Sequence, residues 1–252
     1  MAGKDHYYNK AKQQGYRARS AYKLQQLDEA ASLFDDGMTV VDLGAAPGGW
    51  LQVAIERVGE TGSVLGVDRQ RIDPIEGVET IRGDMTDEET RTAVIERVGS
   101  VDVVVSDMAP NMTGEYSLDH ARSVHLATQA FETAMEVLDA GGDFVAKVFD
   151  GPDLDAFETT VEKEFQYVRR IQPDASRKES SELYLVGKGR LTAPVAVGEQ
   201  LSVTIEDTGN EGDGIAKVEG YTLFVPNVPE GESVTIEVTD VKPNFGFAER
   251  LE

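Results

Sequence analysis

The sequence contains no cysteine among its 252 residues. Disulfide bonds, thiolate metal sites and a cysteine nucleophile are therefore excluded. Histidine is scarce as well, because only His6, His120 and His125 are present, and their spacing is not one that binds zinc. We therefore expect no metal in the functional site.

Long apolar runs are also missing. No stretch approaches the roughly 18 apolar residues that span a membrane, and the opening residues MAGKDHYYNK are too polar for a signal peptide. We expect a soluble, cytoplasmic protein with no membrane partner. Hydrophobic residues still make up 40% of the chain, which suffices for one sizeable core, or for one core and a small second domain.

Positive charge is in short supply. The chain has 24 basic and 46 acidic residues, which gives a net charge of −22. A surface rich in carboxylates repels phosphate, so such a protein either avoids nucleic acid or works where salt screens the repulsion. At about 1 M salt the Debye length falls to about 3 Å. The acidic residues are spread along the chain, and this favours a halophilic protein whose charge serves solubility in high salt.

Residues 1–27 are the exception to this acidity. Their only acidic residue is Asp5, and basic residues and tyrosines alternate through the segment. Such a mixture is typical of nucleic-acid surfaces, which pair phosphate contacts with base stacking; a solvated chain end is the alternative. One basic segment in so acidic a chain favours a function in RNA binding. The residues are Lys4, Lys10, Lys12, Arg17, Arg19 and Lys23, with Tyr7, Tyr8, Tyr16 and Tyr22.

Short β-branched runs alternate with helical patterns from residue 18 to about residue 190. This alternation predicts an α/β fold, namely a doubly wound, mostly parallel Rossmann-like sheet covered on both faces. The expected strands are 39–43, 63–67, 101–106 and 144–149, followed by an antiparallel edge pair at 166–171 and 182–186. The expected helices are 18–34, which Ser20 could cap, and 50–58, 87–98, 118–138 and 154–164.

The pattern changes at about residue 191. Helical patterns end, and short strands separated by Gly, Asn, Asp and Pro turns predict a small β-barrel. The segment KGRLTAPVAVGE marks the boundary. We therefore expect two domains, residues 1–190 and residues 191–252. The expected barrel strands are 201–205, 215–218, 221–225 and 233–238.

Candidate ligand contacts follow successive strands, at the edge where an open parallel sheet binds its ligands. The first strand ends in the glycine loop of VVDLGAAPGGW (40–50), and Asp68, Asp84 and Asp107 follow later strands. The loop has neither the P-loop nor the G-x-G-x-x-G pattern. An acid-lined pocket without a phosphate loop suits a positively charged nucleoside such as S-adenosylmethionine, with Asp68 on the ribose and Asp84 near the adenine. A turn or a helix cap is the alternative for each aspartate alone.

Lys147 lies in the apolar strand FVAKVF. Lysine is almost never fully buried unless it is paired. It could extend from the strand end to water, or it could be an amine with a lowered pKa that accepts a proton at neutral pH. A nearby carboxylate would raise that pKa again, so the sequence leaves the net shift open.

Four motifs together resemble one enzyme family, the FtsJ-type ribosomal RNA 2′-O-methyltransferases, or large-subunit methyltransferase E family. The motifs are VVDLGAAPGGW, SDMAPNMTG, FVAKVFDG and SRKESSELYLVGKG, and the resemblance extends from about residue 17 to residue 189. It implies a Lys-Asp-Lys-Glu catalytic set, S-adenosyl-L-methionine as cofactor, and a uridine ribose in large-subunit (23S) ribosomal RNA as substrate, within the assembled or assembling subunit. The implied catalytic residues are Lys23, Asp107, Lys147 and Glu182, and the implied cofactor contacts are Gly48, Trp50, Asp68, Asp84 and Asp107.

The segment 209–249 is similar to a TRAM domain, a small RNA-binding β-barrel. Its candidate contacts are few, namely Lys217, Lys242, Arg250, Phe245 and Phe247. Because the segment is acidic, a stabilising or oligomerising module is the alternative to RNA binding. For the whole chain, the alternatives are a catalytically weak RNA-binding assembly factor and a methyltransferase acting on another RNA, a protein or a small molecule. The complete catalytic set and the basic arm favour the ribosomal RNA enzyme.

Overall fold

The computed structural model describes residues 6–177, 180–209 and 212–251. Lys4 and Asp5 of the basic arm lie outside these residues, as do the parts of the quoted motifs at 178–179 and 210–211. The chain divides into two compact units, residues 1–163 with 167–188 and residues 164–166 with 189–252. Within the described residues, no helix is both long and apolar enough to cross a membrane.

A seven-stranded sheet of order β3-β2-β1-β4-β5-β7-β6 forms the centre of the first unit. The strands from β3 to β5 pair in parallel, and β7 runs antiparallel to β5. This is the mostly parallel, doubly wound sheet that the alternating pattern predicts, so the predicted fold class is confirmed. The strands are β1 (Thr39–Leu43), β2 (Ser63–Asp68), β3 (Val78–Arg82), β4 (Val101–Ser106), β5 (Leu138–Phe149), β6 (Phe165–Ile171) and β7 (Glu182–Arg190).

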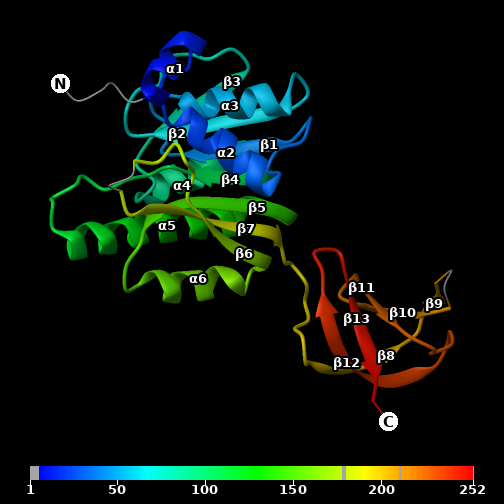
Figure 1. The fold of residues 1–252 in the computed structure, drawn as a ribbon. Coiled ribbons are helices and arrows are strands. Elements are labelled where there is room, and N and C mark those ends of the chain that lie inside the picture. Colours follow the sequence, from blue (N-terminus) through cyan, green and yellow to red (C-terminus); the bar gives the residue numbers. More distant parts are fainter. Residues whose placement is uncertain (1–5, 178–179, 210–211, 252) are drawn as a thin grey trace. The chain divides into compact units, whose positions relative to one another are not determined.

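Helices cover both faces of this sheet (Figure 1). On one face, α2 and α3 bury Leu24 and Trp50 in a cluster with the inner strands. On the other face, Phe131 of α5 packs 5.6 Å from Phe144 of β5 and 6.2 Å from Phe157 of α6, measured between ring centroids. The helices are α1 (His6–Gln14), α2 (Ala21–Ala31), α3 (Gly49–Val58), α4 (Glu88–Val98), α5 (Tyr116–Val137) and α6 (Leu154–Glu162).

Several elements differ from the sequence prediction at their ends, namely α2, β5, β7 and β12 (Ser233–Val241). The helix expected over 18–34 spans only Ala21–Ala31, and Ser20 makes no side-chain cap bond; its carbonyl oxygen instead accepts a hydrogen bond from Trp50 Nε1 at 2.8 Å. Strand β5 begins at Leu138, six residues before its predicted start, because β5 pairs with β4 already from Leu138.

The basic arm contains a helix, α1, that packs on α2 through tyrosines. The Tyr22 ring is buried and lies 5.4 Å from the Tyr7 ring and 5.8 Å from the Tyr16 ring, measured between centroids. Lys10 Nζ lies 4.5 Å above the Tyr22 ring centroid. These three tyrosines therefore hold the arm against the domain and do not form a free stacking surface. Tyr8 is the exposed tyrosine of this segment.

The second unit contains a six-stranded sheet of order β8-β12-β13-β11-β10-β9. The sheet curls into the predicted barrel, because the chain after β8 returns to β10, where Glu206 N–H donates to Ile215 O at 2.8 Å. Aliphatic side chains such as Leu223 and Ile236 fill its core together with Tyr221. The strands are β8 (Gln200–Thr204), β9 (Asp207–Thr208), β10 (Gly214–Val218), β11 (Tyr221–Val225), β12 (Ser233–Val241) and β13 (Phe245–Arg250).

Candidate active site

Lys147 and Asp107 meet at the carboxyl edge of the first unit's sheet. Strand β4 ends at Ser106, which lies opposite Ala146 of β5, so Asp107 comes beside Lys147. Lys147 Nζ donates to Asp107 Oδ1 at 2.8 Å and to Asp107 O at 2.5 Å. Its side chain is 7% exposed, so this lysine is buried and paired. The alternative of a lysine extending into water does not describe it.

Tyr184 of β7 completes the surroundings of Asp107. Its hydroxyl donates to Asp107 Oδ1 at 2.7 Å, because Tyr184 lies directly opposite Lys147 in the antiparallel β5–β7 pair. Burial raises the pKa of Asp107, but the charges of Lys147 and Lys23 and the two side-chain hydrogen bonds outweigh burial and lower it below its ordinary value. Asp107 is therefore a carboxylate, held in place from two strands.

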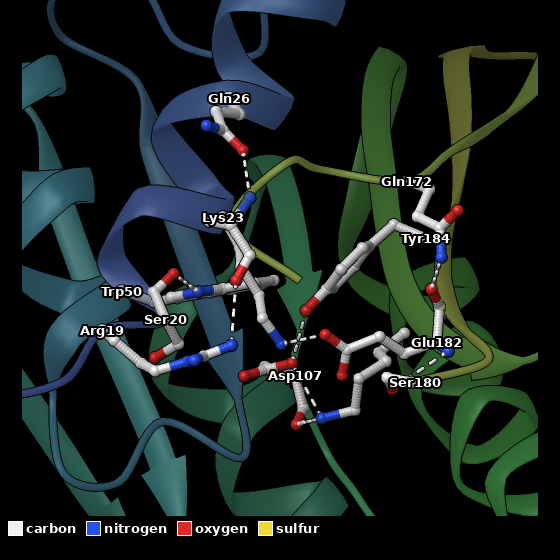
Figure 2. A network of polar contacts seen from close by, with 12 residues as sticks. Arg19, Ser20, Lys23, Gln26, Trp50, Asp107, Gln172, Ser180, Glu182 and Tyr184 are labelled. Atoms are coloured by element: carbon white, nitrogen blue, oxygen red, sulfur yellow. Dashed lines mark hydrogen bonds and ion pairs between the residues drawn. The ribbon is translucent and has the colours of Figure 1, made fainter. Parts of the chain in front are cut away.

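Lys23 and Glu182 form a second buried pair beside the first. Lys23 comes from α2 and Glu182 from the first residue of β7, and Lys23 Nζ lies 2.5 Å from Glu182 Oε1. Figure 2 shows Lys23, Glu182, Asp107 and Tyr184 converging from three parts of the chain. The structure thus brings together the four sequence-predicted catalytic residues. It adds Tyr184, which lies in the predicted edge strand 182–186 but was not among the predicted site residues.

A pocket of about 730 Å³ opens over this cluster. Lys23, Lys147 and Glu182 are among its lining residues, and Arg19 and Arg177 add positive charge. Such a pocket has the size of a small-ligand site. Its basic lining, in a chain of net charge −22, suits an anionic substrate.

Asp42 lies close to the predicted site residues Asp107 and Asp68, and sequence reasoning did not single it out. It lies within β1, is 1% exposed, and neither carboxylate oxygen has a hydrogen-bond partner in the structure. Burial raises the pKa of Asp42 well above its ordinary value, and the nearby charges of Asp107 and Asp68 raise it further. An acid before the glycine loop was visible in the sequence, but its lack of partners depends on the packing of neighbouring strands.

Asp68 and Asp84 both hold the backbone of loops at the ends of their strands. Asp68 accepts the N–H groups of Ala46 and Gln70 at 2.9 and 2.7 Å. Asp84 accepts the N–H and the hydroxyl of Thr86, and these bonds lower its pKa despite some burial. Both aspartates therefore stabilise turns, which was the alternative to a cofactor role. A cofactor role for either one stays a prediction.

The glycine loop is shaped by what lies against it. Gly44 has φ +88°, and a Cβ there would lie 2.5 Å from Met108 Cγ and 3.2 Å from its backbone. Gly48 has φ +108°, and its Cβ would meet Ile75 and Arg17. Arg17 itself donates to the carbonyl oxygens of residues 47, 73 and 74. Close approach of protein atoms therefore already requires glycine at both positions.

The remaining predicted residues are placed as follows. Trp50 is buried, and its ring lies 5.7 Å from that of Tyr184, between centroids. Its side chain is thus a core element, so a cofactor contact would fall on the backbone at the start of α3. His120 is buried, lies 2.9 Å from Phe149 O through Nδ1, and accepts the N–H of Asp153 through Nε2. In the described part of the chain, no three His, Asp or Glu side chains are grouped as metal ligands.

The sheet order, the acid-lined glycine loop and the buried lysine–carboxylate pair define the class of protein, a doubly wound methyltransferase. Comparison with known proteins identifies the family. The chain belongs to the FtsJ-like methyltransferase family, which matches residues 16–190. A TRAM domain matches residues 194–251.

Relatives and a solved structure agree with this assignment. The chain is 67% identical to the Ribosomal RNA large subunit methyltransferase E of Natronomonas pharaonis, over the full length of both proteins. It is 51% identical to the enzyme of the same name from Methanocella arvoryzae, over 99% of this chain and 97% of that protein. The crystal structure of a ribosomal RNA methyltransferase from Plasmodium falciparum superimposes with a TM-score of 0.64 at 27% identity, over 69% of this chain and 98% of the other.

Proposed function

We propose that this protein transfers a methyl group from S-adenosyl-L-methionine to the 2′-hydroxyl of a uridine ribose in large-subunit ribosomal RNA. The observation that carries the proposal is the buried Lys147–Asp107 pair beside the buried Lys23–Glu182 pair, at the floor of a basic pocket. The names of the relatives, which are ribosomal RNA large subunit methyltransferases, support large-subunit ribosomal RNA as the substrate. The uridine ribose is what the resemblance to the FtsJ-type family implies.

The acidic strand ends fit a cationic cofactor. Asp42 leaves a buried carboxyl without a partner, and Asp68 and Asp107 lie close enough to raise its pKa. A sulfonium and an ammonium group would offset this crowding of negative charge. We infer that Gly48, Trp50, Asp68, Asp84 and Asp107 hold S-adenosyl-L-methionine, with Asp42 stabilising its charge. When bound, the cofactor supplies an electrophilic methyl group on sulfur.

Lys147 is suited to take the proton of the ribose hydroxyl. Its two hydrogen bonds to Asp107 use two N–H groups. A neutral lysine amine has two N–H groups and one lone pair. If both N–H groups bond to Asp107, the lone pair stays free to accept a proton. Asp107 thereby orients the proton acceptor, and Tyr184 fixes the Asp107 carboxylate. General-base catalysis of this kind contributes about 10²- to 10⁴-fold to a rate.

Lys23 and Glu182 are suited to position the ribose and its phosphate. Both are lining residues of the pocket, so either can reach a substrate placed there. Glu182 accepts from Lys23, and an incoming hydroxyl can share that carboxylate. Positioning of this kind supplies a large part of a bimolecular rate, because the methyl group is already activated on sulfur.

Replacing Lys147 tests the proposal. Lys147→Ala should lower methyl transfer by about 10²-fold or more, because the proton acceptor is lost, while cofactor affinity changes little. The measurement is transfer of tritiated methyl from the cofactor to unmodified large ribosomal subunits, naked ribosomal RNA and protein, in low and molar salt. Cofactor affinity is measured by calorimetry.

Lys188→Ala is the matched control, because Lys188 is also paired with a buried aspartate, Asp143, and lies outside the pocket. It should retain transfer. Wild-type turnover by Lys147→Ala would exclude the proton-acceptor role. Transfer to protein in place of RNA would exclude the proposed substrate, and no transfer at all by the wild-type chain would support the assembly factor.

A further inference from the structure

The first two turns of α5 carry polar side chains on one helix face. Tyr116, Asp119, His120 and Ser123 follow the i, i+3, i+4, i+7 spacing that on most helices presents apolar residues to a core. Asp119, His120 and Ser123 are buried, and a buried polar group costs free energy unless it is hydrogen-bonded. We call these four residues the polar face of α5. Each of them bonds to the backbone of another segment.

The polar face of α5 holds the loops that follow two strands of the site. Asp119 accepts the N–H groups of residues 113–114 at 2.9 and 3.0 Å, in the loop after β4. His120 and Ser123 bond to the backbone of residues 149–153, where β5 ends and its loop begins. Strands β4 and β5 lead to the proposed proton-acceptor pair. The helix therefore fixes both loops beside that pair.

Tyr116 differs from the other members of the polar face because its side chain is exposed. It is the first residue of α5 and is 57% exposed. Its hydroxyl is nevertheless bonded, because it donates to Asp150 O at 2.5 Å. A tyrosine side chain has only two torsion angles, so the helix at one end and this hydrogen bond at the other restrict the ring. Tyr116 thus presents an aromatic ring in a fixed orientation.

The Tyr116 ring belongs to the pocket that contains Lys147. Met112, which is 63% exposed, lines the same pocket. Of the eight large apolar side chains exposed in the described part of the chain, three lie within residues 112–118. The pocket therefore combines the charged groups of the site with exposed apolar ones. A nucleotide has the same combination, because its ribose and phosphate are polar and the faces of its base are flat and apolar.

We propose that Tyr116 binds the base of the nucleotide whose ribose is methylated, by stacking of that base on its ring. This rests on the proposed function, because it takes the ribose hydroxyl to lie at Lys147 in the same pocket. Every base has a face that stacks on an aromatic ring. Tyr116 is therefore a substrate-binding residue that requires a flat base with one free face and does not discriminate among the four bases.

Replacing Tyr116 tests this assignment in the methyl-transfer assay on large ribosomal subunits. Tyr116→Leu keeps apolar volume and loses the ring, so it should raise KM by about 10-fold with a smaller change in kcat. Tyr116→Phe keeps the ring and loses only the bond to Asp150, so its KM should stay within about 3-fold of the wild-type value. Tyr167→Leu is the matched control, because Tyr167 is an exposed tyrosine outside the pocket. It should leave KM unchanged.

A modified substrate separates stacking from a general effect on the pocket. The methylated uridine is first mapped, and subunits are then reconstituted with RNA that carries dihydrouridine at that position. Dihydrouridine keeps the hydrogen-bonding groups of uracil, but its ring is not planar and stacks poorly. The wild type should lose about 10-fold in kcat/KM on this substrate. Tyr116→Leu should lose little more, because the two changes remove the same interaction.

Three outcomes would overturn the proposal while the wild type still methylates ribosomal RNA. The first is a wild-type KM for Tyr116→Leu. The second is an equal loss in Tyr116→Phe and Tyr116→Leu, which would assign the effect to the bond with Asp150. The third is additive losses from Tyr116→Leu and dihydrouridine. Failure of the proposed function differs from all three, because the wild type would then transfer no methyl group to ribosomal RNA, and both proposals would fall.

Discussion

At the scale of single residues, the site combines one carboxylate that the fold stabilises with another that it penalises. Asp107 accepts hydrogen bonds from Lys147 and Tyr184 and has a lowered pKa. Asp42 of the neighbouring strand β1, opposite Val105 of β4, has no hydrogen-bond partner and a raised pKa. Burying an unpaired carboxylate costs free energy. Such a cost is tolerated where a bound ligand removes it.

We expect Asp42→Asn to stabilise the fold at neutral pH. The pKa of Asp42 is raised on folding. Its contribution to the free energy of unfolding therefore falls as the pH rises above the ordinary carboxyl pKa of about 3.9, and it stays low at pH 7. Removing the charge should raise the free energy of unfolding at pH 7 by about 1 to 3 kcal/mol, with little change near pH 4. Urea unfolding at several pH values measures this.

Cofactor affinity of the same variant should fall by about 10-fold, because the asparagine carries no charge to balance a cation. Asp107→Asn is the comparison variant, and its effect on stability should have the opposite sign. Its lowered pKa means that the charged form stabilises the fold above that pKa, so the substitution should lower stability at pH 7. Identical pH profiles for Asp42→Asn and the wild type would contradict the assignment of a buried, strained carboxyl.

At the scale of elements, the site depends on two loops that touch. Gly44 follows β1 and lies against Met108, the residue after Asp107. The loop after β1 can therefore approach the loop after β4 only without a side chain at position 44. The motif VVDLGAAPGGW was recognisable in the sequence as a glycine loop at the end of a strand. That the approaching atoms belong to Met108 was not, because the contact joins segments more than sixty residues apart.

Gly44→Ala should displace Asp107 and reduce methyl transfer by about 10-fold or more. The substitution places a Cβ 2.5 Å from Met108 Cγ and imposes strain at φ +88°. Gly99→Ala is the matched control, because Gly99 also has positive φ, +64°, but a Cβ there meets nothing within 4 Å. It should lose about 1 kcal/mol of stability and keep full activity. Equal loss of activity in both variants would point to backbone strain alone.

The elements also show how far sequence reasoning reaches. Strands β1, β2 and β4 were predicted to within a residue, since buried parallel strands read as continuous apolar runs. Strand β13 was missed, because FGFAER places its phenylalanines outside and small residues inside. The motifs identified Lys147 and Glu182 as candidates. Tyr184 differs because its importance depends on a hydrogen bond to Asp107, and Asp42 because the packing of neighbouring strands leaves its carboxyl buried without a partner. Such roles depend on tertiary packing, which the sequence pattern of a single segment does not reveal.

At the scale of the whole molecule, charge and domain organisation are linked. Relatives at 62% to 67% identity come from haloarchaea such as Natronomonas pharaonis and Haloarcula marismortui, in agreement with the salt-adapted composition. The chain divides into two compact units, each with its own apolar core. We infer that residues 1–190 and 191–252 unfold as separate domains.

Calorimetry in 2 M KCl should resolve two unfolding transitions. Leu223→Ala removes a fully buried side chain of the barrel core and should lower the stability of that transition by about 2 to 5 kcal/mol, leaving the other in place. Leu51→Ala, equally buried in the first unit, should move only the other transition. A single transition that both variants lower together would show one cooperative domain.

The contact between Trp50 and Tyr184 has a consequence for spectroscopy. Trp50 is the only tryptophan of the chain, and its buried ring lies beside the tyrosine that holds Asp107. The tryptophan fluorescence of this protein therefore arises from one indole, and its neighbour Tyr184 donates a hydrogen bond to the Asp107 of the Lys147–Asp107 pair. Binding, titration or displacement at the site becomes an optical signal that needs no label.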